Sequence, residues 1–247
     1  MHDVQSPPVQ EQLPGEVVAL AASEGLGELR ASFLPKRMGA GRIAGLAFFS
    51  LFGLLVFVLP GLLFIWQLLQ APNFNRKQAA KRIHCFEHGL IVSDRSGPVA
   101  VRWDSASVLQ QITERYANGV YVGTSYLYTL FKRDGSTIEL TGFYANPEVW
   151  GAAIQHEITR AQLPGVLDLL SRGGTAHFCD IAVNAGGMAT AKRGTLPWSE
   201  VQRVEVKNGM VFVEKAGKLL PWSNTPVRKV PNFFMFLAVV DHQRGRS

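Results

Sequence analysis

A long apolar segment near the N-terminus most constrains what this chain can fold into. From Ile43 to Gln70, 28 residues contain no Asp, Glu, Lys, Arg or His, and basic residues stand on both sides. About 20 apolar residues suffice to cross the roughly 30 Å hydrocarbon layer of a bilayer. We therefore expect residues 43–70 to form a transmembrane helix, tilted and kinked at Pro60, that anchors the rest of the chain.

The Pro60-Gly61 pair leaves a second interpretation open, because it could turn the chain into a hairpin that enters the bilayer and returns. Two complete spans would need about 40 residues, which excludes two full crossings. Basic residues are balanced on the two sides, so the positive-inside rule gives no orientation. A single span is the preferred prediction.

The 42 residues before this segment are expected to be a disordered leader that contains one short helix. Residues 1–14 are polar and proline-containing, and they lack the features of a cleaved secretory signal. Residues 16–29 have the apolar spacing of an amphipathic helix. This helix would either lie on the membrane surface or pack on the folded region that follows.

Charge and cysteine content narrow the possible partners. The net charge of +6 is concentrated in residues 173–247, with ten basic and five acidic side chains, which suits an anionic lipid surface or an acidic partner. Basic residues form no run of four, and aromatic residues are not interleaved with them, which argues against nucleic acid. Cys85 and Cys179 could pair, but we expect two reduced thiols, which favours a cytoplasmic C-terminal region.

From Ile83 onward the pattern becomes that of short strands separated by Gly, Asp or Asn. We expect strands at 83–93, 99–103, 107–115, 120–122, 126–133 and 137–141, followed by a helix capped by Asn146 and a second helical stretch at 163–171. After Gly174 we expect strands at 176–183, 188–191, 195–198, 200–207, 210–215 and 218–222. A final helix at 233–242 would be capped by the side chain of Asn232.

This order of elements repeats, and the repeat can be followed by residue. Residues 83–90 align without gaps with residues 181–188, which matches Gly89 with Gly187. Both segments continue to a tryptophan followed by a polar residue, Trp103 and Trp198, which we expect to be core anchors. Both then reach an Asn-Gly pair, at 118–119 and 208–209, which is typical of a type I′ hairpin turn.

The pattern resembles the bacterial pleckstrin-homology-like (PH-like) domains found beside membrane segments. The resemblance implies an α+β, mostly β, fold: two small PH-like antiparallel barrels, each with a C-terminal helix, preceded by the transmembrane helix. The units would cover residues 83–160 and 175–244, joined by a helical connector at 161–174. The second unit departs from the pattern, since residues 223–232 look like a loop where a strand is expected.

The resemblance also implies a role in binding or scaffolding. Related eukaryotic domains hold lipid head groups through basic residues in an early strand–loop–strand segment. The corresponding candidates here are Arg95 and Arg102 in the first unit, and Lys192 and Arg193 in the second. Neither pair reproduces the dense Lys/Arg pattern of high-affinity lipid binders. The alternative interpretation is that these four residues are ordinary solvated charges on loops.

One string has a catalytic appearance, the H-x-x-E-H pattern from His84 to His88. Zinc peptidases need this pattern on a helix, where the two histidines share a face. On a strand the two would lie about 13 Å apart, too far to share one metal ion. No phosphate-binding loop, nucleophile elbow or Cys-x-x-Cys pair is present. We expect no catalysis, no metal and no cofactor.

These observations predict a non-enzymatic, membrane-anchored interaction or scaffold protein. It would reside in a bacterial inner membrane, with the lipid bilayer and an unidentified protein as partners. The alternative is a sensor of anionic lipid head groups that uses the basic C-terminal unit. A further alternative is an enzyme whose site has no recognisable motif.

Overall fold

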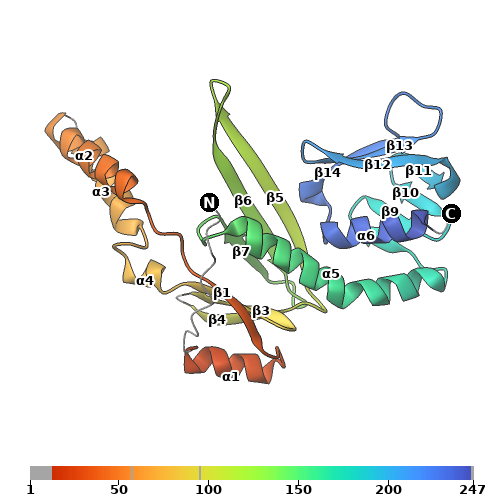
Figure 1. Ribbon diagram of the computed structural model, residues 1–247, viewed down its shortest axis with the longest axis horizontal. Helices are drawn as coiled ribbons and strands as arrows, with labels where there is room; N and C mark the ends of the chain where they lie inside the picture. The colour runs from red at the N-terminus through yellow and green to blue at the C-terminus, as the bar shows by residue number, and fades with distance from the viewer. Residues whose placement is uncertain (1–12, 57, 95, 246–247) are drawn as a thin grey trace, which may run out of the picture. The chain divides into compact units, whose positions relative to one another are not determined.

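The computed structural model describes residues 13–56, 58–94 and 96–245 (Figure 1). The chain divides into two compact units. Unit 1 runs up to Val101 and also contains residues 142–146, whereas unit 2 contains residues 102–141 and the chain from Pro147 onward. Each unit is described separately.

Unit 1 is built on a four-stranded antiparallel sheet in the order β1-β2-β3-β4. Its strands are β1 (Leu29–Phe33), β2 (Arg82–Phe86), β3 (Gly89–Asp94) and β4 (Gly97–Arg102). The segment expected to be a leader therefore supplies the first strand of this sheet. Helix α1 (Gly15–Ser23) packs on it through Val17 and Ala21, which share a core cluster with Phe86 and Ile91. The amphipathic helix thus contacts the sheet.

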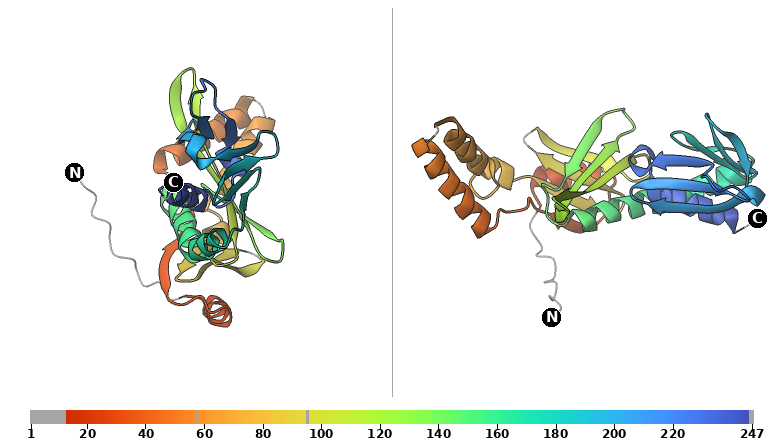
Figure 2. Two further views of the ribbon diagram at one scale, coloured as in Figure 1. Left: turned by 90° about the vertical axis from the view of Figure 1, so that its right-hand side faces the viewer. Right: turned by 90° about the horizontal axis from the view of Figure 1, so that it is seen from above.

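The long apolar segment lies between β1 and β2 and forms two helices, α2 (Ala40–Val56) and α3 (Val58–Gln70), followed by the short α4 (Arg76–Ala79). Helices α2 and α3 lie side by side in every view (Figures 1 and 2). They run antiparallel, since Phe49 contacts Phe64 with ring centroids 6.0 Å apart and Gly53 lies against Gly61. The chain reverses before Pro60, which takes the third position of α3, where a missing N–H is tolerated.

The prediction of a transmembrane helix over residues 43–70 is therefore wrong. Across the described residues, no helix combines the length and the apolar character that a membrane crossing requires. Helices of 17 and 13 residues replace the single helix expected over 28 residues. The predicted single pass through a bacterial inner membrane depended on that helix and is wrong for the same reason. The cytoplasmic side assigned to the C-terminal region rested instead on the expected reduced thiols.

The first part of unit 2 is a three-stranded antiparallel sheet covered by a long helix. The strands are β5 (Ser107–Ala117), β6 (Val120–Phe131) and β7 (Thr137–Thr141), and the helix is α5 (Pro147–Ser171). Strand β6 is continuous where two strands were expected, and α5 is one helix that contains Pro164. On α5, Trp150 stacks edge to face on Tyr128 of β6, with ring centroids 5.2 Å apart.

The second part of unit 2 contains two more antiparallel sheets and the C-terminal helix. The elements are β8 (Ala176–Phe178), β9 (Ile181–Asn184), β10 (Gly187–Thr190), β11 (Gly194–Pro197), η1 (Trp198–Glu200), β12 (Val201–Lys207), β13 (Met210–Lys215), β14 (Ser223–Pro226), η2 (Val227–Lys229) and α6 (Phe233–Arg244). Their shared core includes Phe178, Met188, Val211 and Phe236, and Leu170 of α5 belongs to it. Helix α5 therefore contributes to the cores of both parts of unit 2.

The sheets do not close into barrels, so the expected barrel architecture is wrong. The described residues form four separate sheets of four, four, three and three strands, and each keeps two unpaired edge strands. In the C-terminal half, β11 ends at Pro197 and η1 separates it from β12. Because proline has no backbone N–H, the ladder cannot continue through this position.

The order of elements nevertheless repeats. A four-stranded meander, a three-stranded meander and a helix occur first as β1–β4, β5–β7 and α5, and then as β8–β11, β12–β14 and α6. Gly89 and Gly187 begin the third strand of their meanders, and Trp103 and Trp198 follow the fourth. The type I′ turns are confirmed, because both residues of Asn118-Gly119 and of Asn208-Gly209 have positive φ.

The contact of α5 with β6 predicts that replacing two glycines of α5 by alanine changes the free energy of unfolding in opposite directions. At Gly151 a Cβ would collide with the ring and hydroxyl of Tyr128, whereas at Gly165 it would meet open space. We expect Gly151→Ala to lower the free energy of unfolding by about 1–3 kcal/mol. Gly165→Ala should raise it by up to about 1 kcal/mol, since alanine favours the helix. Chemical denaturation measures both, and equal effects would contradict this packing.

Two buried tyrosines predict an alkaline limit to stability. Burial raises the pKa of Tyr128, and separately that of Tyr144, to about 12 from the usual value near 10. Folding therefore favours the neutral phenols. Their contribution to stability is complete below pH 10 and is lost as the pH rises towards 12. Absorbance at the phenolate band should show Tyr128 and Tyr144 ionising last. Titration of all tyrosines together near pH 10 in the folded protein would contradict this.

Candidate functional site

The α2–α3 hairpin has reversed packing: its small residues face the helix contact and its large apolar residues face outward, the opposite of a hairpin in a water-soluble core. Its buried positions along the helix contact are small: Ser50, Gly53 and Gly61. A Cβ on Gly53 would lie 2.9 Å from the Cα of Gly61, so only glycine permits this approach of the two helices. Small residues at the contact with large apolar residues facing outward are the arrangement that helices adopt in lipid.

The outward side chains form the hairpin surface, which is exposed on both helices. Its large apolar members are Phe48, Phe49, Leu51, Phe52, Leu54, Leu55, Val58, Leu59, Leu62, Leu63, Trp66 and Leu69. Leu55 and Leu59, beside the turn, are 79% and 81% exposed. Contiguous exposed apolar surface of this kind marks an interaction site rather than an ordinary protein exterior.

A side-chain clasp closes the base of the hairpin. The backbone N–H of Met38 donates to Oδ1 of Asn73 at 2.7 Å, and Nδ2 of Asn73 donates to the carbonyl of Met38 at 3.1 Å. Asn75 then accepts hydrogen bonds from the N–H groups of Lys77 and Gln78 and so starts α4. The two chains leaving the hairpin are thereby held together at its base.

Basic side chains surround this clasp. Lys36 and Arg37 precede it, Arg42 lies in the first turn of α2, and Arg76 and Lys77 follow it; all five are exposed. Within the described part of the chain none of these five has an ion-pair partner. Residues 29–86 contain eight Lys or Arg and no Asp or Glu. The base therefore carries uncompensated positive charge next to an apolar surface.

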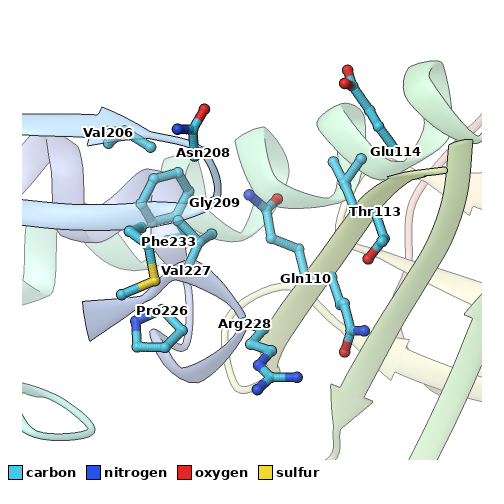
Figure 3. Close-up of a pocket in the computed structure, with 13 residues that line it drawn as sticks. Gln110, Thr113, Glu114, Val206, Asn208, Gly209, Pro226, Val227, Arg228 and Phe233 are labelled. Carbon is cyan, nitrogen blue, oxygen red and sulfur yellow. The ribbon is translucent and has the colours of Figure 1, made fainter. Parts of the chain in front are cut away.

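Unit 2 contains a separate cleft of about 800 Å³, shown in Figure 3. One wall is the stretch of β5 from Gln110 to Glu114. The opposite wall is formed by the β12–β13 turn, the end of β14 with η2, and Phe233 at the start of α6. The N–H of Val227 donates to the carbonyl of Gly209 at 2.9 Å, which joins η2 to that turn.

Asn232 joins the start of α6 to β5 beside the cleft. Its side-chain oxygen accepts from the N–H of Val108 at 2.8 Å, and its own N–H donates to the carbonyl of Val108 at 2.9 Å. Asn232 was expected to cap α6, but its side chain makes no cap hydrogen bond there. Its φ of 48° turns the side chain onto β5 instead. Gln162 of α5 supports it through a 3.4 Å contact.

The structure does not bring the predicted basic candidates into one site. Arg95 lies outside the described residues. Arg102 ends β4 and forms an ion pair with Asp104 at 2.6 Å, and hydrogen bonds from its guanidinium lower the pKa of that carboxyl. Lys192 and Arg193 share the exposed turn between β10 and β11. None of the three described residues lines the cleft.

The other residues singled out in the sequence occupy buried, closely packed or hydrogen-bonded positions. Trp103 is 1% exposed and its carbonyl accepts from Gln162 at 2.6 Å, while the indole of Trp198 donates to the carbonyl of Asn184 at 3.0 Å. At Gly187 a side chain would collide with the carbonyl of Leu196. His84 lies on β2, buried and bonded to Ser32 at 2.8 Å. The described residues contain no group of three or more His, Cys, Asp or Glu placed to hold a metal.

Pro60-Gly61 had indicated a hairpin as the alternative, but sequence reasoning missed which residues form the helix contact, the base of the hairpin and the cleft. Asn73, Gly53 and Gly61 carried a usable signal, since glycines and an amide inside and beside an apolar segment indicate close helix packing. Gln110, Met210 and Phe233 carried none, because only the tertiary fold brings them to one cleft.

These features define a class of α+β protein with two successive four-plus-three-strand halves and an apolar helical hairpin inserted after its first strand. The chain belongs to a family described as a family of unknown function (DUF6585), whose profile matches residues 16–246. No curated protein and no solved structure matches it.

The bonds of Asn232 to β5 predict a selective loss of stability on their removal. Asn232→Gly keeps a residue that tolerates positive φ but leaves the buried N–H of Val108 without its acceptor. We expect the free energy of unfolding to fall by about 1–3 kcal/mol. Asn208→Gly is the matched control, because Asn208 also has positive φ but lies in an exposed turn. Its change should stay within about 0.5 kcal/mol. Similar losses in both variants would show that the greater backbone freedom of glycine in the unfolded chain, not the lost side chain, dominates.

Proposed function

We propose that this protein is a binding and scaffold protein that attaches to anionic lipid surfaces by inserting the α2–α3 hairpin part of the way into the bilayer. The observation that carries the proposal is the reversed packing of the hairpin, with glycines inside and leucine, phenylalanine and tryptophan outside. In water this surface would be strongly unfavourable, since each buried apolar side chain is worth about 1.5–3 kcal/mol on transfer. Lipid is the environment in which such packing is favourable.

The dimensions support insertion without crossing. Helix α2 has 17 residues and is therefore about 25 Å long, which is shorter than the roughly 30 Å hydrocarbon layer. With its base at the head groups, the turn near Leu55 and Leu59 would reach into the hydrocarbon and remain there. Trp66, in the part of α3 nearer the base, has the amphipathic ring that favours the interface.

The positive charge at the base of the hairpin supports binding to an anionic lipid. The five exposed basic side chains around the Met38–Asn73 clasp would lie at head-group level when the hairpin is inserted. Each Lys or Arg near such a surface contributes about 1 kcal/mol. The proposal therefore assigns the lipid contact to unit 1, whereas the alternative predicted from the sequence used the basic C-terminal unit. Arg102, Lys192 and Arg193 have no part in the proposal.

The scaffold part of the proposal rests on unit 2. Unit 2 combines three small antiparallel sheets and the long helix α5 with an open cleft. Amides and apolar side chains dominate the cleft walls, which suits recognition of another molecule rather than transfer of a chemical group.

Flotation of the purified full chain with vesicles tests lipid attachment. We expect binding to phosphatidylcholine vesicles that contain phosphatidylglycerol. Leu55→Asp with Leu59→Asp should abolish it, since each carboxylate costs about 3 kcal/mol in the hydrocarbon. The matched control is Leu220→Asp, because Leu220 is 80% exposed and lies in unit 2. This control should bind like the unsubstituted protein.

A second experiment tests how much the Lys and Arg side chains at the base of the hairpin contribute to lipid binding. Arg76→Gln with Lys77→Gln should weaken binding to anionic vesicles by about 2 kcal/mol, roughly thirtyfold. The loss should shrink as salt rises from about 0.1 M to about 1 M, since screening shortens the Debye length to about 3 Å. Absence of flotation would refute the proposal. So would a stable dimer without lipid that dissociates on Leu55→Asp, because the hairpin surface would then bind a second copy.

A further inference from the structure

We propose that the cleft of unit 2 binds an extended peptide, which adds a strand to the free edge of β5. The inference concerns unit 2 alone and does not depend on lipid attachment. It rests on the backbone of β5, on the position of Asn232, and on the apolar side chains that face the edge across the cleft.

The hydrogen bonds of Val108 show which residues of β5 direct their backbone N–H and C=O groups to the free edge. Strand β5 is the edge of its sheet and pairs only with β6 on its other side. Both backbone groups of Val108 bond to Asn232, so they point to the free edge. In an antiparallel strand, every second residue directs its N–H and C=O to the same side. Gln110, Ile112 and Glu114 therefore present their backbone groups to the free edge, inside the cleft.

Helix η2 lies close to β5, so the part of the edge that is open for pairing is the stretch that lines the cleft. Within the described residues, the backbone of Gln110, Ile112 and Glu114 makes no hydrogen bond beyond the sheet. Val108, the preceding residue of the same parity, is satisfied by Asn232. Asn232 thus occupies the place that the end of a neighbouring strand would take. A peptide entering the cleft would continue that strand along β5.

The cleft walls specify the side chains of such a peptide. Ile112 is 48% exposed on β5, and Val206 is 43% exposed beside the β12–β13 turn. Met210 and Phe233 continue this apolar wall. Figure 3 shows Val206 and Phe233 on one side of the cleft and Gln110, Thr113 and Glu114 on the other. Alternate side chains of a strand face the same way, so the occupant is an extended segment with apolar residues at alternating positions.

The volume agrees with this occupant. At about 800 Å³ the cleft falls in the range of pockets that hold ligands of several hundred daltons, which is a short peptide segment. Addition of a strand gives affinity through main-chain hydrogen bonds and specificity through alternate side chains. Only three residues of β5 offer edge groups here, so the paired stretch is short.

The test uses the full chain in mild detergent and a displayed library of linear octapeptides with apolar residues at alternating positions. We expect enriched peptides to slow hydrogen exchange in residues 107–117. Methylation of the peptide amides that face β5 should reduce affinity at least tenfold, and methylation of the intervening amides should not. Loss of affinity with both methylation sets alike, or with neither, would overturn strand addition, as would failure to enrich any binder.

Variants test the same site from the protein. Ile112→Pro removes an N–H directed at the free edge and should reduce affinity at least tenfold, with the circular dichroism of the fold unchanged. Val206→Asp should also weaken binding, whereas the control Val122→Asp, at a 59% exposed position of β6, should not. Equal binding by Val206→Asp and Val122→Asp would refute the assigned cleft. Concentration-dependent protection of β5 without peptide would assign the edge to a second copy and overturn the proposal.

Discussion

The close contact between Gly53 and Gly61 is the constraint on which the N-terminal half of the structure depends. It lets α2 and α3 run antiparallel, and the Asn73 clasp then returns the chain to the place that it left. Because of this return, Phe33 at the end of β1 can pair with Ile83 in β2. A straight helix would carry the chain about 42 Å away over the same 28 residues and leave β1 without its neighbour.

Asn232 plays the corresponding part in unit 2. With positive φ and a short amide side chain, it meets both backbone groups of Val108 and contacts Gln162 on α5. One residue therefore connects the start of α6, the long helix and the edge of β5. It also determines where the occupied part of that edge ends and the open part begins.

Local patterns could be predicted from the sequence, whereas features that depend on distant partners could not. The Asn-Gly turns and most strands of residues 176–215 follow from turn chemistry and period-two hydrophobicity. Hydropathy is the same for a spanning helix and a hairpin, so only the Gly53–Gly61 contact separates them. Residues 163–171 were expected to form a second helical stretch, but they continue α5, and Leu163, Val166 and Leu167 pack against the C-terminal core. The partner of Asn232 is 124 residues away, beyond any local pattern.

The position of the hairpin between two paired strands has a consequence for synthesis of the chain on the ribosome. Strand β1 cannot find its neighbour until Arg82 and the following residues have been added, about 50 residues later. At typical rates of translation this takes about 2–10 s. Over the last dozen residues of this interval, α2 and α3 are already complete while the first sheet has not yet formed. The apolar hairpin therefore meets its surroundings before unit 1 has folded.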